Sequence, residues 1–448
     1  MWVSAISWPH LLVNCTQNIQ RRRGACALLV IGRLDDTAGF TLWIAFCYHD
    51  TEIFYREVSM PTNTGELNLF LLKADGLVRC RWDGKSNRAE ILNSALDGEI
   101  VREVAADPFE PKRLYAATLT EIHVSDDGGE TWKWLPSGGI DYRDIWTMAV
   151  HPTRPDEIYV GTLPAAVYVS ENGGRSFREL SAFRNLADYN KWTFPPGPHV
   201  AHARCITLDA RVPDEIIVGI EEGGIARSRD RGATWEDISG PASATAFPKI
   251  NDPAGIVPYE MGKHEDGRVY RDVHWITRHP TRLETLFAST GLGTYKSDNG
   301  GNSWTKCEYG MGRAYAIPMC NHPTAPDRVY LGAAENGPAA WPGYRTVRAG
   351  PYNTVKFSRN TSAQTGGAKT QILRSDDAGA TWRVLTDGLP SGYSHMTCGF
   401  AVNPLDNNSI CVGYTDGAIY ATNDAGDRWR RLGIQQDKLY GIRLIPAV

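Results

Sequence analysis

Apolar residues in this 448-residue chain fall into short runs that turn-forming residues separate at regular intervals. The pattern is clearest in the four successive runs 145–150, 157–161, 166–170 and 176–180. Short runs bounded by Gly, Asn, Asp and Pro are typical of β-strands. The pattern therefore predicts a repeating unit of four short strands, here called A to D in chain order.

One turn motif recurs six times between strands C and D, with the pattern Ser-x-Asp-x-Gly-x-Thr-Trp. The shortest spacings between copies are 45 and 47 residues, the period of one β-propeller blade. Four copies follow the pattern closely and two are degenerate. These turns, called box turns below, begin at Ser125, Ser170, Ser228, Ser297, Ser375 and Thr422.

The residue types of the box turn indicate a structural role. An Asp or Asn oxygen can accept a hydrogen bond from the backbone N–H two residues on and so close a turn. The glycine supplies a positive φ, and the tryptophan is a wide apolar plate for packing against neighbouring strands. We therefore expect a hairpin pinned by side chains and not a set of catalytic carboxylates.

A second repeated element is the corner between strands A and B, where His, Asp or Asn usually precedes Pro. A small residue follows ten residues after each corner, inside strand B. Histidine shares this position with Asp and Asn, so a capping role is favoured over metal binding. The corners begin at Asp107, His151, Asp209, His279, His322 and Asn403.

The two ends of the repeat region predict a seventh, split blade. Residues 67–73, 76–82 and 89–92 look like strands B, C and D, and residues 439–446 look like a lone strand A. Their pairing would close the ring and remove a sheet edge that invites aggregation. The expected fold class is all-β, with a single seven-bladed β-propeller over residues 60–448 that the C-terminal strand closes.

Residues 1–59 differ from the repeat region and are expected to be an N-terminal extension. The apolar runs at 25–32 and 40–48 are too short to span a bilayer, and Arg21-Arg22-Arg23 is a weak secretory signal. The extension is a targeting segment, a disordered tail or a non-native stretch upstream of Met60, and we prefer the last. Without a convincing signal peptide or transmembrane segment, we expect a cytoplasmic protein.

Charge and cysteine usage narrow the partners. The net charge of −4 gives no general attraction for nucleic acid. Nine cysteines are present without a Cys-x-x-Cys pair, so neither a zinc site nor a disulfide framework is supported. We expect a monomer without cofactor or metal. One metal alternative stays open, His199-x-x-His202 together with His274 or His395.

The box turns resemble those of the Asp-box (bacterial neuraminidase repeat) superfamily, over about residues 65–446. That superfamily includes sialidases, two-propeller xyloglucan hydrolases, sortilin-type receptors and photosystem II assembly factors, so the resemblance implies the fold and leaves function open. A true sialidase is not implied, because sialidases have six blades and an early Phe/Tyr-Arg-Ile-Pro motif. Only the fragments Tyr344-Arg345-Thr346-Val347 and Tyr315-Ala316-Ile317-Pro318 occur here.

Topology predicts which face of the ring binds a ligand. The A–B corners and the box turns share one end of each blade, called the box end, and the other end is called the mouth end. The insertions 181–202, 240–272 and 333–370 all fall at the mouth end, which marks it as the binding face. Their aromatic residues suit sugar rings or a protein partner, or else only pack the loops.

Polar residues that begin the A strands or lie in the B–C loops are expected around the mouth of the central channel, the default place for a ligand. Any one of them is more often a rim residue than a catalytic one. The candidate ligand-binding residues are Arg102, Asp144, His199, His202, His274, Tyr315, Glu335, His395, Arg443, Trp192 and Trp341. The candidate catalytic residues are Asp272, Glu221 and Glu222.

Two functions fit these residues. The first is binding of a glycan, protein or peptide at the mouth end, ranked slightly ahead because no family-specific catalytic motif is present. The alternative is a glycoside hydrolase, whose two carboxylates should lie about 5–5.5 Å apart for retention or roughly 6.5–9.5 Å apart for inversion. Glu221 or Glu222 in one blade and Asp272 at the start of the next could meet that spacing.

Overall fold

The computed structural model describes residues 67–447 except 143, 187–188, 190–191, 195–198, 242–266, 314 and 336–366, together with the backbone of three earlier strands. The chain divides into two compact units, Met1–Asn63 and Thr64–Val448. In the first unit, β1 (Leu28–Leu34), β2 (Phe40–Tyr48) and β3 (Glu52–Ser59) form one antiparallel sheet. Whether this unit is native to the protein stays a prediction.

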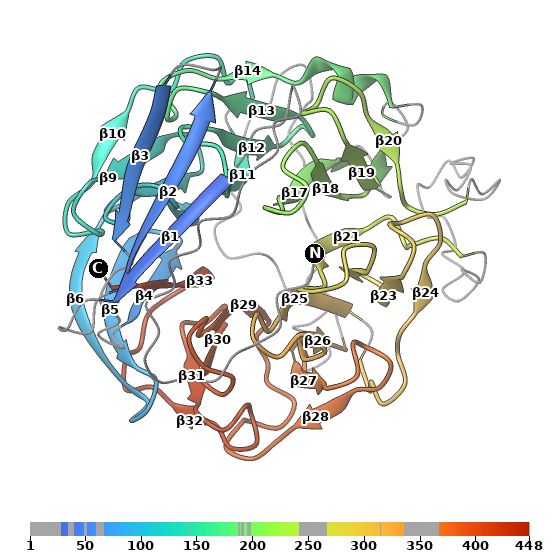
Figure 1. Ribbon diagram of the computed structural model, residues 1–448. Coiled ribbons are helices and arrows are strands. Elements are labelled where there is room, and N and C mark those ends of the chain that lie inside the picture. Colours follow the sequence, from blue (N-terminus) through green and yellow to red (C-terminus); the bar gives the residue numbers. More distant parts are fainter. Residues whose placement is uncertain are drawn as a thin grey trace. The chain divides into compact units, whose positions relative to one another are not determined.

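The second unit is a seven-bladed propeller, and its described residues form seven four-stranded antiparallel sheets around a central axis (Figure 1). Blade 2 contains β7 (Val101–Ala106), β8 (Leu114–Thr118), β9 (Ile122–Ser125) and β10 (Lys133–Leu135). Blade 3 contains β11 (Ile145–Val150), β12 (Ile158–Thr162), β13 (Val167–Ser170) and β14 (Arg178–Glu179). Blade 4 contains β17 (His202–Thr207), β18 (Ile216–Glu221), β19 (Gly224–Ser228) and β20 (Glu236–Asp237).

The remaining blades repeat this order from the axis outward. Blade 5 contains β21 (Val273–Arg278), β22 (Leu286–Thr290), β23 (Gly293–Ser297) and β24 (Thr305–Lys306). Blade 6 contains β25 (Tyr315–Asn321), β26 (Val329–Ala334), β27 (Gln371–Ser375) and β28 (Arg383–Leu385). Blade 7 contains β29 (Thr397–Val402), β30 (Ile410–Tyr414), β31 (Ile419–Thr422) and β32 (Arg430–Arg431). Between blades 3 and 4 lie the 3-10 helix η1 (Ser181–Asn185), β15 (Thr193–Phe194) and β16 (His199–Val200).

Blade 1 closes the ring with the two ends of the repeat region, as predicted. The tail strand β33 (Leu439–Pro446) pairs antiparallel with β4 (Leu67–Lys73), which is followed by β5 (Gly76–Asp83) and β6 (Arg88–Ala95). One hydrophobic cluster joins Trp82 of this blade to Cys411 of blade 7, and both side chains are fully buried. Burial of such apolar surface stabilises the closure by roughly 1.5–3 kcal/mol per large side chain.

The box turns are pinned by side chains, but not through the bond that the sequence suggested. In the first copy, the Asp127 carboxylate accepts the N–H of Thr131 at 2.9 Å and its hydroxyl at 2.5 Å, four residues on. The N–H of Gly129, two residues on, donates instead to Ser125 Oγ at 2.8 Å. The expected two-residue turn at the Asp is therefore wrong, because the serine hydroxyl takes that donor. Gly129 has φ +87°, and a Cβ there would lie 2.8 Å from the Phe70 ring.

The corner histidines cap the A–B turns, as predicted. His151 Nδ1 accepts the N–H groups of Thr153 and Arg154 at 3.1 and 3.0 Å. His279 and His322 each accept two backbone N–H groups in the same way. Strand registers place corners and box turns at one end of the sheet, because Ile158 pairs with both Val150 and Ser170. The stems of the three insertions leave from the other end.

Every innermost strand contains a β-bulge at the same register, near its start. In six blades the bulge leaves one residue of the innermost strand without an opposing residue on the next strand. In blade 6 two residues, Ile317 and Pro318, lie opposite one residue of the next strand. Bulges re-aim side chains. The bulged residues, called the bulge ring below, are Arg102, Trp146, Arg204, His274, Ile317 with Pro318, Cys398 and Tyr440.

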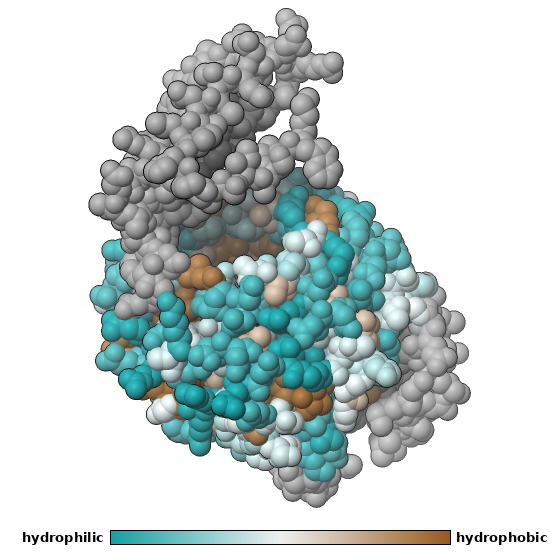
Figure 2. All heavy atoms as spheres, turned by 60° about the horizontal axis from the view of Figure 1, so that its bottom comes forward, coloured by the Kyte–Doolittle hydropathy of each residue, from teal (hydrophilic) through white to brown (hydrophobic). Residues whose placement is uncertain are grey.

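On the face shown in Figure 2, the described surface is mostly hydrophilic, and its hydrophobic residues form small groups. The large exposed apolar side chains of the described residues lie on different blades, at Ile91, Trp134, Tyr309 and Leu405. Scattered apolar residues of this kind are normal for a protein surface and do not mark a docking patch. Among the described residues, no helix has the length and apolar character needed to cross a membrane.

Candidate functional site

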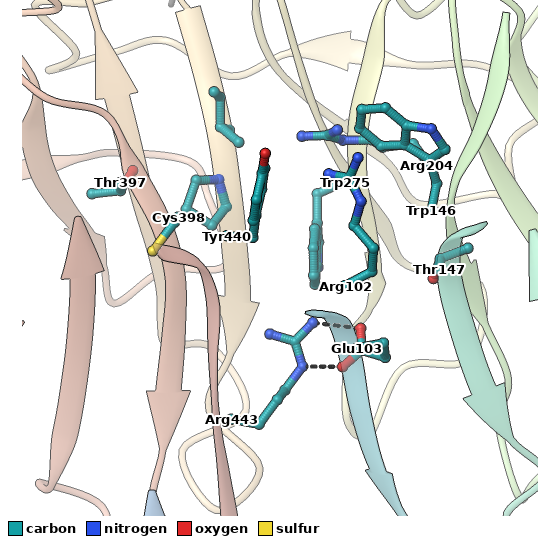
Figure 3. Close-up of a pocket in the computed structure, with 12 residues that line it drawn as sticks. Arg102, Glu103, Trp146, Thr147, Arg204, Trp275, Thr397, Cys398, Tyr440 and Arg443 are labelled. Carbon is teal, nitrogen blue, oxygen red and sulfur yellow. Dashed lines mark hydrogen bonds and ion pairs between the residues drawn. The ribbon is translucent and has the colours of Figure 1, made fainter. Parts of the chain in front are cut away.

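The central channel is lined by the bulge ring, apart from His274, and by a few neighbours on the same strands (Figure 3). Arg102 lies between two aromatic rings, 4.3 Å from the centre of Trp146 and 4.6 Å from that of Tyr440. Arg204 also lies over Trp146, with its guanidinium carbon 5.0 Å from the centre of that ring. Four consecutive blades thus contribute to one alternating stack of guanidinium groups and aromatic rings.

A half-buried ion pair supports the channel wall on the side of the closing strand. The Arg443 guanidinium donates through Nε and Nη2 to both oxygens of Glu103, each at 2.5 Å (Figure 3). Such a bidentate pair fixes both side chains. Glu103 is thereby committed to Arg443, which joins blade 1 to blade 2.

Three acidic side chains meet beside the channel, where blades 4 and 5 adjoin. Glu221 ends β18 opposite His202, and Glu222 follows it in a turn that Gly223 closes by donating to Ile220 at 3.0 Å. Asp272 directly precedes β21. The three acids with His202, Arg204 and His274 are called the carboxylate cluster below. Ligand atoms of Glu221, Asp272 and His274 all lie within 4.8 Å of one another.

The pKa values of two neighbouring acids of this cluster are shifted in opposite directions. Burial would raise the pKa of Glu221, but His202 at 3.0 Å and Arg204 at 3.4 Å outweigh it and hold this pKa well below its usual range. Burial raises the pKa of Glu222 well above its usual range, and the charge of Asp272 adds to the effect. Of the two acids, Glu222 is therefore the one that holds a proton more readily, and Glu221 is the one that ionises more readily.

The backbone at Glu222 is unusual as well. Its φ of +70° lies in the left-handed region, which costs a residue with a side chain roughly 1–2 kcal/mol. Neither carboxyl oxygen has a hydrogen-bond partner among the described residues, although Arg271 lies 3.3 Å from one of them. Buried polar atoms without partners point to a water, ion or ligand at that place.

His274 orients Asp272. Its Nδ1–H donates to the carbonyl of Ala316 at 2.6 Å, and its Nε2 lies 3.2 Å from an Asp272 oxygen. Burial alone would lower the pKa of His274, but the charges of Asp272 and Glu221 outweigh it, so the pKa is raised. With oxygen acceptors at both ring nitrogens, the imidazolium form is favoured. Gly291 makes room for Asp272, because a Cβ there would meet its Oδ2 at 2.2 Å.

Asp144 extends this polar arc toward blade 3. It is 4% exposed, and its Oδ1 has no hydrogen-bond partner among the described residues. Burial raises the pKa of Asp144, while Arg102 and His202 act in the opposite direction. The His202 ring packs on Trp146 with 4.0 Å between centres, which links Asp144, the channel stack and the carboxylate cluster.

The structure brings most of the predicted site residues together and separates the others. The contiguous set is Arg102, Asp144, His202, Glu221, Glu222, Asp272, His274 and Tyr315, whose ring lies 4.9 Å from that of His274. Glu335 is exposed and binds Lys369 and Arg313, each at 2.9 Å. His395 lies 3.6 Å from Asp416, and Arg443 lies in the channel wall with Glu103. Their roles in a site stay predictions.

The aromatic candidates from the insertions divide in the same way. Trp192 packs on Phe183 and Tyr189, with ring centres at 5.7 and 5.0 Å, and lies against Gly223 in the turn after Glu222. It therefore buttresses the loop that holds the acids. Trp341 and the side chain of His199 lie outside the described residues.

Sequence reasoning missed Trp146, Arg204, Trp275, Tyr440 and Arg271. The first residues of the A strands were expected to border the channel, whereas the bulge turns the following residue toward it. Trp146 and Tyr440 lie one position after the expected strand starts at 145 and 439, an offset that could have found them, whereas Arg204 lies two positions after His202.

A metal ion would find three ligands here. Within the described chain, Glu221, Asp272 and His274 are the group close enough to share one ion, whereas His395 pairs with Asp416 and does not join the histidine set considered from the sequence. Arg204 and Arg271 lie 3.4 and 3.3 Å from carboxylates of the cluster and already supply positive charge. The arrangement favours hydrogen bonding to a polar ligand over metal binding.

Two curated proteins that resemble this chain in sequence carry the same name. The oligoxyloglucan-reducing end-specific xyloglucanase of Emericella nidulans is 27% identical over 362 residues, 75% of this chain and 40% of that protein. A probable enzyme of the same name from Neosartorya fischeri is 25% identical over 223 residues, 44% of this chain and 26% of that protein. The chain thus spans less than half the length of these relatives. No protein-family model matches it.

Among solved structures, the GH74 xyloglucanase from Xanthomonas campestris superimposes with a TM-score of 0.50 at 18% identity. The match covers 75% of this chain and 45% of that one. At this identity the likeness concerns the fold, and it agrees with the propeller described above.

Proposed function

We propose that this propeller binds a glycan at the mouth end of its central channel. The observation that carries the proposal is a set of buried carboxyl oxygens beside the channel, Asp144 Oδ1 and both oxygens of Glu222, which have no hydrogen-bond partner among the described residues. Sugar hydroxyls both donate and accept hydrogen bonds, so they can satisfy an ionised and a protonated carboxyl at once. A purely apolar ligand would leave these groups unsatisfied.

Two further observations support a glycan over a protein partner. The sequence relatives at 25–27% identity are xyloglucanases by name. Stable protein interfaces use broad apolar patches, whereas the large exposed apolar side chains among the described residues lie one to a blade, at Ile91, Trp134, Tyr309 and Leu405. The repeated box turns likewise support membership in the Asp-box superfamily, whose propellers include carbohydrate-active enzymes.

A glycan array with the full chain tests this proposal. We expect binding by the wild type, a loss of at least about tenfold in affinity for Asp144→Leu, and no change for Asp127→Ala, a matched removal of a carboxylate at the box end. Thermal melts establish that both variants are folded. Binding of peptides without any saccharide, or equal binding by both variants, would contradict the proposal.

Hydrolysis of the bound glycan is a second candidate, favoured by the opposite ionisation of Glu222 and Glu221. A glycosidase needs one protonated carboxyl to protonate the leaving oxygen and one carboxylate as base or nucleophile. Glu222 has the properties of the acid, and Asp272, oriented by His274, lies where a base could act. Glu221 would then provide fixed negative charge, since His202 and Arg204 hold it.

Leaving-group dependence separates hydrolysis from binding alone. Glu222→Gln should abolish turnover of oligosaccharides but keep turnover of dinitrophenyl glycosides, whose leaving group needs no proton. Asp272→Ala should abolish both while the protein stays folded. In the wild type, turnover should fall as the pH rises through the raised pKa of Glu222. Binding without turnover of any aryl glycoside would leave the binding proposal and remove this one.

A further inference from the structure

We infer that a groove on the outer rim of blade 5 is a second, weaker binding site for the glycan. This inference rests on the proposed glycan binding and adds a second point of contact on the chain. The groove, called the rim groove below, has a volume of about 460 Å³. It is lined by the box turn and outermost strand β24 of blade 5 and by Ala380 in the box turn of blade 6 (Figure 1). It shares no residue with the channel lining or the carboxylate cluster.

One lining residue is a strongly exposed aromatic side chain. Tyr309 is 77% exposed, the highest value among the large exposed apolar side chains of the described residues. A single exposed side chain does not mark a site, but this one lies at a groove that can receive a ligand. A tyrosine ring offers an apolar face and a polar edge, which suits a sugar ring with apolar C–H groups and polar hydroxyls.

The segment that carries Tyr309 is held in place by hydrogen bonds. From blade 6, the Trp382 N–H donates to the Tyr309 carbonyl at 2.9 Å, and Trp382 Nε1–H donates to the Cys307 carbonyl at 3.1 Å. Within blade 5, the Cys307 N–H donates to the Thr294 carbonyl at 2.8 Å. The backbone of one side of the groove is therefore ordered before a ligand binds, which lowers the entropic cost of binding.

The charged side chains of the rim groove are paired with one another. Lys306 lies 2.9 Å from Glu308, and both line the groove. Lys296 lies 3.1 Å from Asp298, and both line it as well. Two lysines against two acids leave these four side chains without net charge, so they do not favour a free ion. Their ammonium and carboxylate groups can still exchange hydrogen bonds with hydroxyls, which favours a neutral saccharide.

The box turn of blade 5 forms another side of the groove and is already satisfied internally. Asn299 Oδ1 accepts the N–H of Ser303 at 2.9 Å, and Asn299 Nδ2 donates to Ser303 Oγ at 2.9 Å. A ligand in the groove would thus be held by side chains and would add no protection to the amides of the turn. Hydrogen bonds to exposed charged groups contribute less than those to buried ones, so the rim groove should be the weaker site.

The test is a calorimetric titration of the full chain with a saccharide that the array identifies and that the chain does not hydrolyse. We expect two binding events per chain. Tyr309→Ala should weaken the weaker event by about tenfold or more and leave the tighter one unchanged, because it removes the apolar face. Asp144→Leu should weaken the tighter event and leave the weaker one unchanged.

Trp134→Ala is the matched control, since Trp134 is also an exposed aromatic residue, at 58%, but does not line the groove. It should retain both events. Ala380→Trp fills the groove from blade 6 and should abolish the weaker event without removing Tyr309. Thermal melts show that each variant is folded.

A single binding event that neither Tyr309→Ala nor Ala380→Trp alters would overturn the inference while the mouth-end proposal stands. Binding that Tyr309→Ala removes and Asp144→Leu leaves intact would support the rim groove and contradict the mouth-end proposal. Failure to bind any saccharide would overturn both.

Discussion

The two ends of each blade use the same residue types for opposite purposes. At the box end, His279 is neutral and accepts backbone N–H groups, and burial lowers its pKa. At the mouth end of the same strand, His274 donates from Nδ1, lies beside Asp272, and has a raised pKa. The carboxylates differ likewise, because Asp127 is saturated by its own turn and Glu222 has no hydrogen-bond partner among the described residues.

The difference separates residues that the fold itself requires from residues that it leaves free to vary. Backbone groups at the box end need side-chain partners, and blades 2 to 7 supply them with the same box turn. At the mouth end, each bulge leaves one residue, or two in blade 6, without a partner on the next strand. The side chains of these residues are therefore free of the demands of strand pairing and can vary from blade to blade. Repetition marks the structural end, and variation marks the end at which a ligand can be selected.

The largest expected effect is a loss of stability when the ion pair that supports the channel wall is removed. Glu103→Ala should destabilise the protein by roughly 2–3 kcal/mol, less than for a fully buried pair, because it leaves the half-buried guanidinium of Arg443 without its partner. Removal of Asp387, whose pair with Arg428 is exposed, should cost no more than about 1 kcal/mol. Urea unfolding measures both. A cost for Glu103→Ala as small as for Asp387→Ala would show that the channel wall does not depend on this pair.

Next in size is the effect of filling the space beside Asp272. Gly291→Ala places a methyl group against Oδ2, so we expect a loss of about 1–3 kcal/mol in stability together with weaker glycan binding. Gly433→Ala is the matched control, because no atom lies within 4 Å of its added Cβ. Calorimetric binding and thermal melts on both variants give the result. Unchanged binding by Gly291→Ala would mean that Asp272 does not contact the ligand.

The paired histidines should give opposite dependences of stability on pH. The pKa of His274 is raised, so its contribution is complete at low pH and is lost as pH rises through that value. The pKa of His279 is lowered, so its contribution is complete above the unfolded-state pKa and is lost as pH falls. For one proton each slope is at most about 1.4 kcal/mol per pH unit.

The measurement is the free energy of unfolding as a function of pH, across the pKa values of the two histidines, for the wild type, His274→Gln and His279→Gln. The difference between each variant and the wild type gives the slope that the replaced histidine contributes. Slopes of the same sign for both residues would remove the contrast between the ends.

The smallest effect concerns a single box turn. Asp127→Ala should cost about 1 kcal/mol and leave binding unchanged. The pKa of Asp127 is lowered to about 2, with hydrogen bonds from Thr131 and Ser125 opposing the effect of burial. Its contribution is therefore present above the ordinary value of 3.8 and is lost as pH falls toward 2. A change in glycan affinity in this variant would contradict the separation of the two ends.

Much of the fold was predictable because each blade repeats one solution. The bounds of β4, β11 and β33 match the expected strands, and the closure by the tail followed from a missing strand at one end and a spare strand at the other. The mouth end was predictable from chain topology alone. These features depend on periodicity, which a sequence displays directly.

The chemistry of the site was less predictable, because it depends on contacts between blades. Glu221, Asp272 and His274 were expected near one another. The opposite shifts in the pKa values of Glu221 and Glu222 were not, because the lowered pKa of Glu221 depends on Arg204 and His202 on the neighbouring strand. Trp146 and Arg204 were missed because a bulge is defined by the partner strand's register. Trp192 packs on Phe183 and against Gly223 in the turn after Glu222, a contact that the sequence did not indicate, and its role in ligand binding stays a prediction.

Hydrogen–deuterium exchange of the full chain, with and without a saccharide identified on the array, tests the central claim most directly. The account predicts protection at the starts of the innermost strands, around Arg102, Trp146, Arg204 and His274, and none at the box turns. Protection confined to the box turns, or to the outer strands, would contradict it.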